Sequence, residues 1–268
     1  MPAKPIRSSH LPHDPPGQHT PLVSTVVVAS YKGGVGKTAL AVAIAERLAW
    51  GGLRVLLITC DSQQDARARL GVRPSEPASA HRAYGHDGSI TVLGLASAKA
   101  VELLYRTGPE RFGVGMVDVV VLDTPPEVQG GSLPGVLLVT PVDGADAARN
   151  LVTMLRRTPA NTAIMLVRLG REDPDEWAEN VEAIQEALDR SVQFLAEPLP
   201  KSARIASAHN EGESVWTIPR AGGTRAFLGG VDALARMAWE RLDTRRPWLA
   251  MPPASASAPY VPGWDDEA

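Results

Sequence analysis

The sequence predicts an α/β protein with a mostly parallel, doubly wound sheet and helices on both faces. Two observations carry this prediction. Continuous apolar runs, such as TVVVAS at 25–30, are typical of strands that are buried on both faces in a parallel sheet. Segments with the helical spacing of apolar residues follow most of these runs, and alternation of strand and helix is the pattern of a doubly wound sheet.

Six apolar runs are expected to be buried strands, and a seventh stretch, 192–200, to hold a shorter one. The six are 25–30, 53–59, 89–95, 117–123, 135–140 and 162–169. Helices are expected at 38–52, 97–107, 144–158, 173–190 and 224–243. The first of these ends at a glycine pair, a common helix stop, and the fourth has an acidic first turn, which suits the helix dipole.

Composition limits the class of protein. The 268 residues are 44% hydrophobic, enough for a full core. The formal net charge of −3 argues against coating by nucleic acid through bulk charge, so any DNA contact needs a local basic patch. The single cysteine, Cys60, excludes an intrachain disulfide and a paired-cysteine metal site. No apolar run approaches the length of a membrane span, and the N-terminus lacks the apolar core of a secretory signal, so a cytoplasmic protein is expected.

The two ends of the chain differ in composition from the part between them. Residues 1–22 are rich in proline and histidine and are expected to be a disordered tail. Residues 247–268 are rich in proline, alanine and serine, finish in acidic residues, and are expected to be a second tail. Trp248 and Trp264 lie in this second tail, where they could dock on a partner or fold back on the domain. Residues 23–246 are expected to form the folded domain.

The stretch GGVGKT at 33–38 lies between an apolar strand and a helix, which is the context of a phosphate-binding loop. Glycines let backbone N–H groups converge on phosphate oxygens, and the helix N-terminus adds its dipole. Lys37 is expected to reach the β- and γ-phosphates, and Thr38 to offer its hydroxyl to Mg²⁺. The sheet is therefore expected to be that of a P-loop NTPase.

The longer pattern KGGVGKT, in which Lys32 precedes the glycines, resembles the deviant Walker A motif of ParA/MinD-type ATPases, and it looks most like the ParA partition proteins. In that family the first lysine crosses the interface of an ATP-dependent homodimer. The resemblance implies that Lys32 does so here and is catalytic together with Lys37; the alternative is a solvated lysine near an anion. The implied ATP-binding set is Lys32, Gly33, Gly34, Val35, Gly36, Lys37, Thr38, Ala39 and Pro200.

Two acidic positions extend the resemblance, which covers roughly 24–243. Family members often carry D-x-D-P-Q-G after the next strand, and alignment on the glutamine places Asp61 on the second aspartate, with Thr59 in place of the first. Asp61 is implied to orient the attacking water or to support the Mg²⁺ shell, and it could also cap a following helix. Asp123, at the end of VDVVVLD, resembles the Walker B aspartate that holds Mg²⁺ through water.

The sequence departs from the family after Asp123. Relatives usually carry a helix there before the next strand, whereas 127–135 is too short for a helix with two loops. A trimmed switch region of this kind could alter the dimer face or the surface that meets a partner protein. The replacement of the first aspartate by Thr59 puts the rate of hydrolysis in doubt. Partner specificity is therefore not transferred from the family.

The segment 197–227 resembles, more loosely, the part of ParA proteins that contacts adenine and DNA. Pro200 is a candidate for packing near the base, and Arg168 is a weaker one. ParA proteins bind DNA without sequence preference once ATP has dimerised them, through phosphate contacts and counterion release. The implied DNA-binding residues are Lys201, Arg204, Arg220 and Arg225, and the alternative is a solvated basic surface.

The leading hypothesis is a ParA-like ATPase with ATP and Mg²⁺ as cofactors. It would dimerise on ATP, bind nonspecific DNA on the nucleoid and move DNA or other cargo. A centromere-binding or adaptor protein would stimulate its slow hydrolysis. The alternative is a nucleotide-dependent protein scaffold, or a MinD-like positioning switch, with little or no DNA binding. Membrane docking is not expected, because the chain ends in prolines and acidic residues rather than in a basic amphipathic helix.

Overall fold

The fold is taken from a computed structural model that describes a set of ranges separated by gaps. These are 24–30, 33–60, 65–73, 75–77, 79–84, 88–95, 114–124, 137–142, 145–160, 162–170, 173–188, 192–195, 197–242 and 248. Several sequence predictions therefore lie outside the described residues. They concern Lys32, Asp61, Trp264, the helix at 97–107 and the short segment 127–135.

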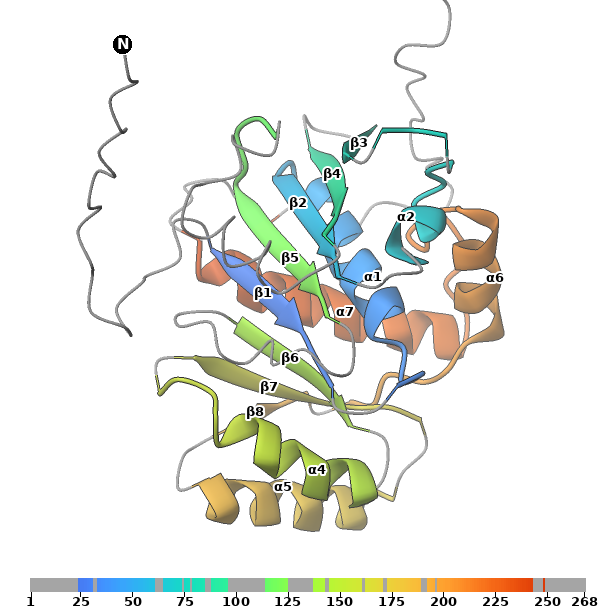
Figure 1. The fold of residues 1–268 in the computed structure, drawn as a ribbon. Coiled ribbons are helices and arrows are strands. Elements are labelled where there is room, and N and C mark those ends of the chain that lie inside the picture. The colour runs from blue at the N-terminus through green and yellow to red at the C-terminus, as the bar shows by residue number, and fades with distance from the viewer. Residues whose placement is uncertain are drawn as a thin grey trace, which may run out of the picture.

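Eight strands form one sheet in the order β3-β4-β2-β5-β1-β6-β7-β8 (Figure 1). All neighbouring strands are parallel except β3, which runs antiparallel to β4. The strands are β1 (Thr25–Val28), β2 (Arg54–Thr59), β3 (Ser79–Ala83), β4 (Ser89–Gly94), β5 (Val119–Asp123), β6 (Leu137–Val142), β7 (Ala163–Arg168) and β8 (Gln193–Phe194). The mostly parallel, doubly wound sheet expected from the sequence is confirmed.

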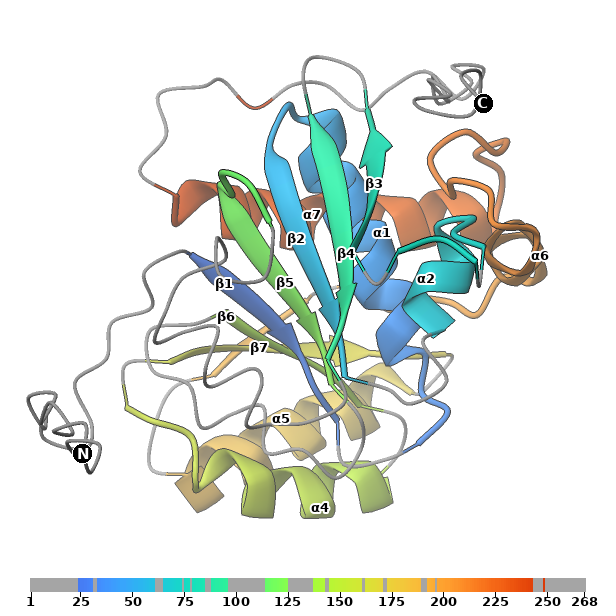
Figure 2. The same ribbon diagram turned by 45° about the horizontal axis from the view of Figure 1, so that its top comes forward.

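Helices cover both faces of this sheet. Figures 1 and 2 show α1 and α7 on one face and α4 and α5 on the other, with α2 and α6 beside each other at the end of the α1–α7 layer. The helices are α1 (Lys37–Trp50), α2 (Asp65–Arg69), α4 (Ala145–Leu155), α5 (Pro174–Leu188), α6 (Ala203–Glu211) and α7 (Gly223–Glu240).

The core consists of two apolar layers, one on each side of the sheet. Successive side chains of a strand point to opposite faces, so Val26 and Val28 pack with α1 and α7, whereas Val27 packs with α4 and α5. The same alternation divides β2, where Leu57 joins the first layer and Leu56 the second. This two-sided burial explains why the strands read as continuous apolar runs.

Four elements differ from the sequence predictions. Strand β3 and helix α6 were not expected, and β8 is only two residues long within the stretch 192–200. Strand β6 begins and ends two residues later than the predicted 135–140, and it includes Pro141, opposite Val167 of β7. Proline lacks the N–H of a sheet ladder, so a sequence pattern ends the strand before it even when the neighbouring backbone continues.

A buried arginine joins α1, α7 and the C-terminal segment. The side chain of Arg47 is fully buried, and its Nε lies 2.5 Å from Oδ1 of Asp232. Its guanidinium lies 4.0 Å from the ring centre of Trp248 and 5.9 Å from that of Trp216. The ring centres of Trp248 and Trp239 are 5.3 Å apart. Trp248 therefore packs on its own chain and shields a charged pair. Of the two alternatives considered for Trp248, docking on a partner or folding back on the domain, the structure shows the second.

We expect Asp232→Asn to lower the free energy of unfolding by about 3 kcal/mol, because it removes the countercharge of a buried guanidinium. Urea denaturation checks this value. The control is Asp118→Asn, whose carboxylate pairs with Arg54 at the surface, where the two side chains are 35% and 22% exposed. The control is expected to lose about 1 kcal/mol or less. Equal losses in both variants would contradict a special contribution from the Arg47 pair.

Candidate nucleotide-binding site

The loop between β1 and α1 has the backbone of a phosphate-binding loop. Gly34 and Gly36 have φ values of 71° and 83°, in the left-handed region that favours glycine. A Cβ added at either position would meet nothing within 4 Å, so the space beside the loop is open. Gly33, Gly34 and Gly36 are exposed, whereas Val35 is buried against the core. The loop can therefore receive a ligand without moving side chains.

Helix α1 presents an uncapped N-terminus to this space. Its N-cap is Gly36, which has no side chain to satisfy the first N–H groups, and the first turn holds no acidic residue. The first helical hydrogen bond runs from Leu40 N–H to Gly36 O, at 3.0 Å. Lys37 is buried at 7% exposure, and Thr38 and Ala39 are half-buried. The N–H groups at the start of the helix, the helix dipole and a buried cation together fit a polyphosphate.

The strand register places an acidic residue beside the loop. Asp123, the last residue of β5, is paired with Val28 of β1 on one side and with Thr59 of β2 on the other. Thr124 fixes this corner, because its Oγ1 donates a hydrogen bond to Val28 O at 3.1 Å. Asp123 is 2% exposed. A carboxylate at the carboxyl edge of a parallel sheet, one strand from the phosphate-binding loop, fits a water-mediated Mg²⁺ contact.

The neighbours of Asp123 add two chemical details. Burial and the charge of Asp123 raise the pKa of Cys60 to about 12, so this thiol stays protonated and is not a nucleophile. The hydroxyl of Thr59 is buried and has no hydrogen-bonding partner among the residues described. Thr59 thus provides a neutral group at the position where the family motif carries an aspartate. The other acidic position, Asp61, lies in the gap 61–64, outside the described residues.

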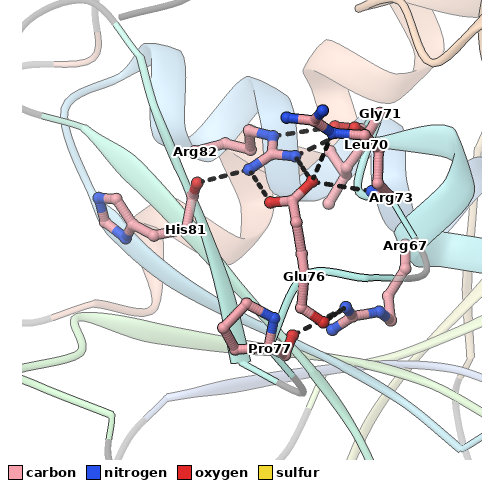
Figure 3. Close-up of polar contacts among 8 residues, drawn as sticks. All are labelled: Arg67, Leu70, Gly71, Arg73, Glu76, Pro77, His81 and Arg82. Carbon is pink, nitrogen blue, oxygen red and sulfur yellow. Dashed lines mark hydrogen bonds and ion pairs between the residues drawn. The ribbon is translucent and has the colours of Figure 1, made fainter. Parts of the chain in front are cut away.

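A cluster of arginines fixes the segment that follows this gap. Figure 3 shows Arg82 of β3 between the carboxylate of Glu76 and the carbonyl oxygens of Leu70 and Gly71, at the end of α2. The guanidinium of Arg82 lowers the pKa of Glu76 to about 2, so the carboxylate stays charged. Arg67 donates to the carbonyl oxygens of Glu76 and Pro77 (Figure 3). Arg67 and Arg82 therefore stabilise this segment through contacts within the domain.

A pocket of about 290 Å³ lies beside the phosphate-binding loop. Gly34, Val35, Gly36 and Ala39 line one side, and Leu199, Pro200 and Lys201 line another. Pro200, predicted from the sequence to pack near a base, is therefore at a pocket that the loop shares. Arg168, the weaker candidate, is buried at the end of β7 and is not among the lining residues. The mostly apolar walls suit a flat ring.

The predicted DNA-binding residues do not share one environment. Lys201, Arg204 and Arg225 are exposed, and a 3.1 Å hydrogen bond between Ser202 and Thr224 holds the segment of the first two next to the start of α7, where Arg225 lies. Arg220 is only partly exposed, and burial and the charge of Arg47 lower its pKa. Three of the four cations thus gather at the start of α6 and α7, and Arg220 leans toward the core.

Two polar residues of the pocket wall, His209 of α6 and Arg69 of α2, were missed by sequence reasoning. Neither belongs to a motif, and α6 itself was not expected. Its N-cap offered a signal, since Ser202 accepts a hydrogen bond from Ile205 N–H at 3.5 Å and serine is a preferred N-cap. Helical spacing from Ser202 would have placed Ile205 and His209 on one face.

Comparison with known proteins identifies the group to which this site belongs. Residues 26–215 match the family described as the CobQ/CobB/MinD/ParA nucleotide binding domain, CbiA, which is more than half of the chain. The chain belongs to this family. The ParA/MinD-type resemblance of the Walker A motif is therefore confirmed, and the chain contains the nucleotide-binding domain of a P-loop ATPase of this type.

Individual relatives are similar over different shares of the chain. The chromosome-partitioning ATPase Soj of Thermus thermophilus is 49% identical over 51 residues, which are 19% of this chain and about a fifth, 20%, of Soj. Two solved structures show the fold alone, at 18% identity each. MinD from Pyrococcus horikoshii with Mg-ADP has a TM-score of 0.55 over 83% of this chain and 100% of MinD. The pNOB8 ParA bound to nonspecific DNA has a TM-score of 0.56, over 82% and 98% respectively.

The family assignment limits what the described residues need to do. When bound, Mg²⁺ would supply positive charge that offsets the negative charge of the phosphates during phosphoryl transfer. The loop N–H groups and Lys37 could hold the phosphates, and Thr38 and Asp123 could orient the ion and its water. Within the described ranges, no helix combines the length and apolar character that crossing a membrane would require.

Proposed function

We propose that this ATPase is a ParA-like switch that dimerises on ATP, binds duplex DNA without sequence preference, and moves DNA or other cargo along the nucleoid. A centromere-binding or adaptor protein stimulates its slow hydrolysis and releases the dimer. The ATPase domain spans 23–246, flanked by the tails 1–22 and 247–268. Lys32 acts across the dimer interface, and Lys37, Thr38, Asp61 and Asp123 serve the phosphates, Mg²⁺ and the attacking water.

The observation that carries this proposal is the position of the segment that follows β8. Lys201 lines the pocket shared with the phosphate-binding loop and is also exposed at the surface. Arg204 follows it on α6, and the Ser202–Thr224 hydrogen bond keeps this turn beside Arg225. A nucleotide in the pocket therefore contacts the same short segment that presents cations outward. Dimerisation would double this patch, and paired patches raise affinity for one DNA molecule by avidity.

The test is a double substitution, Arg204→Ala with Arg225→Ala, because neither residue lines the pocket. In the presence of ATP, we expect affinity for duplex DNA to fall about 10-fold or more, and the slope of log affinity against log salt to fall by about 2 per protomer. ATP affinity is expected to be unchanged. The matched control is Arg236→Ala on α7, an arginine of 59% exposure that pairs with Glu240. Equal DNA affinity in both variants would contradict the assigned surface.

A second candidate function has one observation in its favour. Thr59 places a buried hydroxyl where family members often have an aspartate, so hydrolysis could be very slow and the protein could act as a nucleotide-dependent scaffold for other proteins. Turnover measured with and without duplex DNA separates the two. The scaffold would bind ATP, leave DNA unbound and hydrolyse at a rate that DNA does not change.

A further inference from the structure

The pocket beside the phosphate-binding loop has a polar inner wall that the family motifs do not explain. Its volume, about 290 Å³, lies just below the range of roughly 300–1,000 Å³ found for small-molecule sites. Leu199, Pro200 and Phe227 supply apolar surface. His209 of α6 and Arg69 of α2 also line it, and both can make directed polar contacts with a ligand.

His209 has an unusual environment for a histidine. Its side chain is 1% exposed, and neither Nδ1 nor Nε2 has a hydrogen-bonding partner among the described residues. The Nε of Arg69 is buried in the same condition. A buried polar group left without a partner costs about 1–3 kcal/mol, and such exceptions in folded proteins call for a reason. A ligand that enters the pocket and supplies the missing partner is such a reason.

The two elements that carry these groups are held together by a close backbone contact. A Cβ added to Gly212, just after α6, would lie 2.7 Å from Cα of Gly71, just after α2. The guanidinium of Arg82 donates a hydrogen bond to the carbonyl oxygen of Gly71, at 3.0 Å, and so holds Gly71 in place (Figure 3). The ends of α2 and α6 are therefore positioned against each other, which sets where the ring of His209 lies relative to Arg69. Such positioning is what a binding wall requires.

The ring is neutral at physiological pH. Burial, followed by the charge of Arg69, lowers the pKa of His209 to about 3. A neutral imidazole offers one donor and one acceptor, and the Nε–H of Arg69 offers a further donor. Adenine presents an acceptor ring nitrogen next to its donor amino group along one edge. The two sets are complementary, whereas an inorganic phosphate chain has no donor for the imidazole acceptor.

We propose that His209 and Arg69 form the polar inner wall of this pocket and hold the edge of the adenine base of bound ATP, with His209 accepting from or donating to that edge. This inference rests on the proposed nucleotide site and adds to it the residues that read the base. It assigns to His209 a role in affinity for the base and none in holding the phosphates.

The test compares ATP with inorganic tripolyphosphate, both with Mg²⁺, by calorimetry on the full chain. His209→Leu removes both ring nitrogens and keeps an apolar side chain, and His209→Gln keeps one donor and one acceptor. We expect His209→Leu to weaken ATP binding about 10-fold, the equivalent of one lost hydrogen bond, and to leave tripolyphosphate binding unchanged. Arg69→Met is expected to act in the same direction, and His209→Gln to recover much of the ATP affinity.

The binding results distinguish a role of His209 at the base from a role at the phosphate-binding loop. An unchanged ATP affinity in His209→Leu would overturn the inference while the nucleotide site stands. Equal weakening of ATP and tripolyphosphate would overturn it too, because the ring would then act on the loop. If the wild type bound neither ATP nor tripolyphosphate, both the proposed nucleotide site and this inference would be wrong. Thermal denaturation without nucleotide verifies that the variants fold. The His209→Leu variant is expected to be at least as stable as the wild type, because replacing an unpartnered polar ring by an apolar group has a neutral or favourable effect on stability.

Discussion

Lys37→Ala is expected to lower ATP affinity by about 100-fold or more and with it to abolish every ATP-dependent property of the protein. Lys37 begins α1, is 7% exposed, and lies beside two left-handed glycines that leave open space for a phosphate chain. A buried cation interacts with a polyanion more strongly than a cation in bulk water does. No other described residue of the loop, 33–39, carries a charge that could replace it.

Calorimetry with ATP and Mg²⁺ measures this effect. Lys201→Ala is the matched control, because Lys201 is also a lysine at the pocket but is exposed. The control is expected to change ATP affinity by less than about fivefold, as surface charges do. If Lys37→Ala bound ATP as the wild type does, the loop would not be the phosphate site, and the role given to its glycines would be wrong.

Glu46→Gln is expected to stabilise the protein above pH 7 by about 3 kcal/mol. Glu46 lies in the middle of α1, fully buried, and burial raises its pKa to about 7, partly offset by Ser214 and by the hydroxyl of Tyr84, which donates to Oε1 at 3.0 Å. In the unfolded chain the pKa is near 4.5. The folded state therefore holds a proton that the unfolded state has lost, and the contribution of Glu46 to stability falls as pH rises from about 4.5 to about 7.

Urea denaturation at pH 5 and pH 8 tests this sign. The difference between Glu46→Gln and wild type isolates Glu46, because His209, with its lowered pKa, acts in the opposite direction below about pH 6.5 and is present in both proteins. The difference is expected to be small at pH 5 and about 3 kcal/mol at pH 8. A variant that was no more stable than the wild type at pH 8 would show that the buried carboxylate is compensated.

The sequence predicted the elements whose signal is local. The apolar runs of β1, β2, β5 and β7 reflect burial on both faces, and the phosphate-binding loop depends on glycines and one lysine within a few residues. These features follow from short stretches of chain, so one sequence suffices to find them. Asp123 could be proposed as a site residue for the same reason, since an acidic residue at the end of an apolar run is visible without knowledge of the partners of the strand.

Features that depend on tertiary pairing were missed. Strand β3, SAHRA, has no apolar run, because it is an edge strand whose His81 and Arg82 make polar contacts with Thr91 and Glu76. Helix α6 mixes small and polar residues, and its apolar face becomes evident only against the pocket. His209 and Arg69 meet only because α2 and α6 touch through two glycines far apart in the sequence. No local pattern predicts such a meeting.

The basic residues of the described chain differ in what they contact. In the folded protein, Arg67 and Arg82 are occupied by Glu76 and by carbonyl oxygens, so they stabilise the domain (Figure 3). The exposed cations of the proposed DNA surface are instead Lys201, Arg204 and Arg225.

The most direct test of the central claim is the affinity of the wild-type protein for nonspecific duplex DNA with ATP, with ADP and without nucleotide, at one stated salt concentration. The proposal predicts that DNA binds with ATP only, that it binds as a complex with the dimer, and that added salt weakens it through counterion release. DNA affinity that does not change with nucleotide, or no DNA binding in any of the three states, would contradict the proposed partition switch and leave the protein scaffold as the function to pursue.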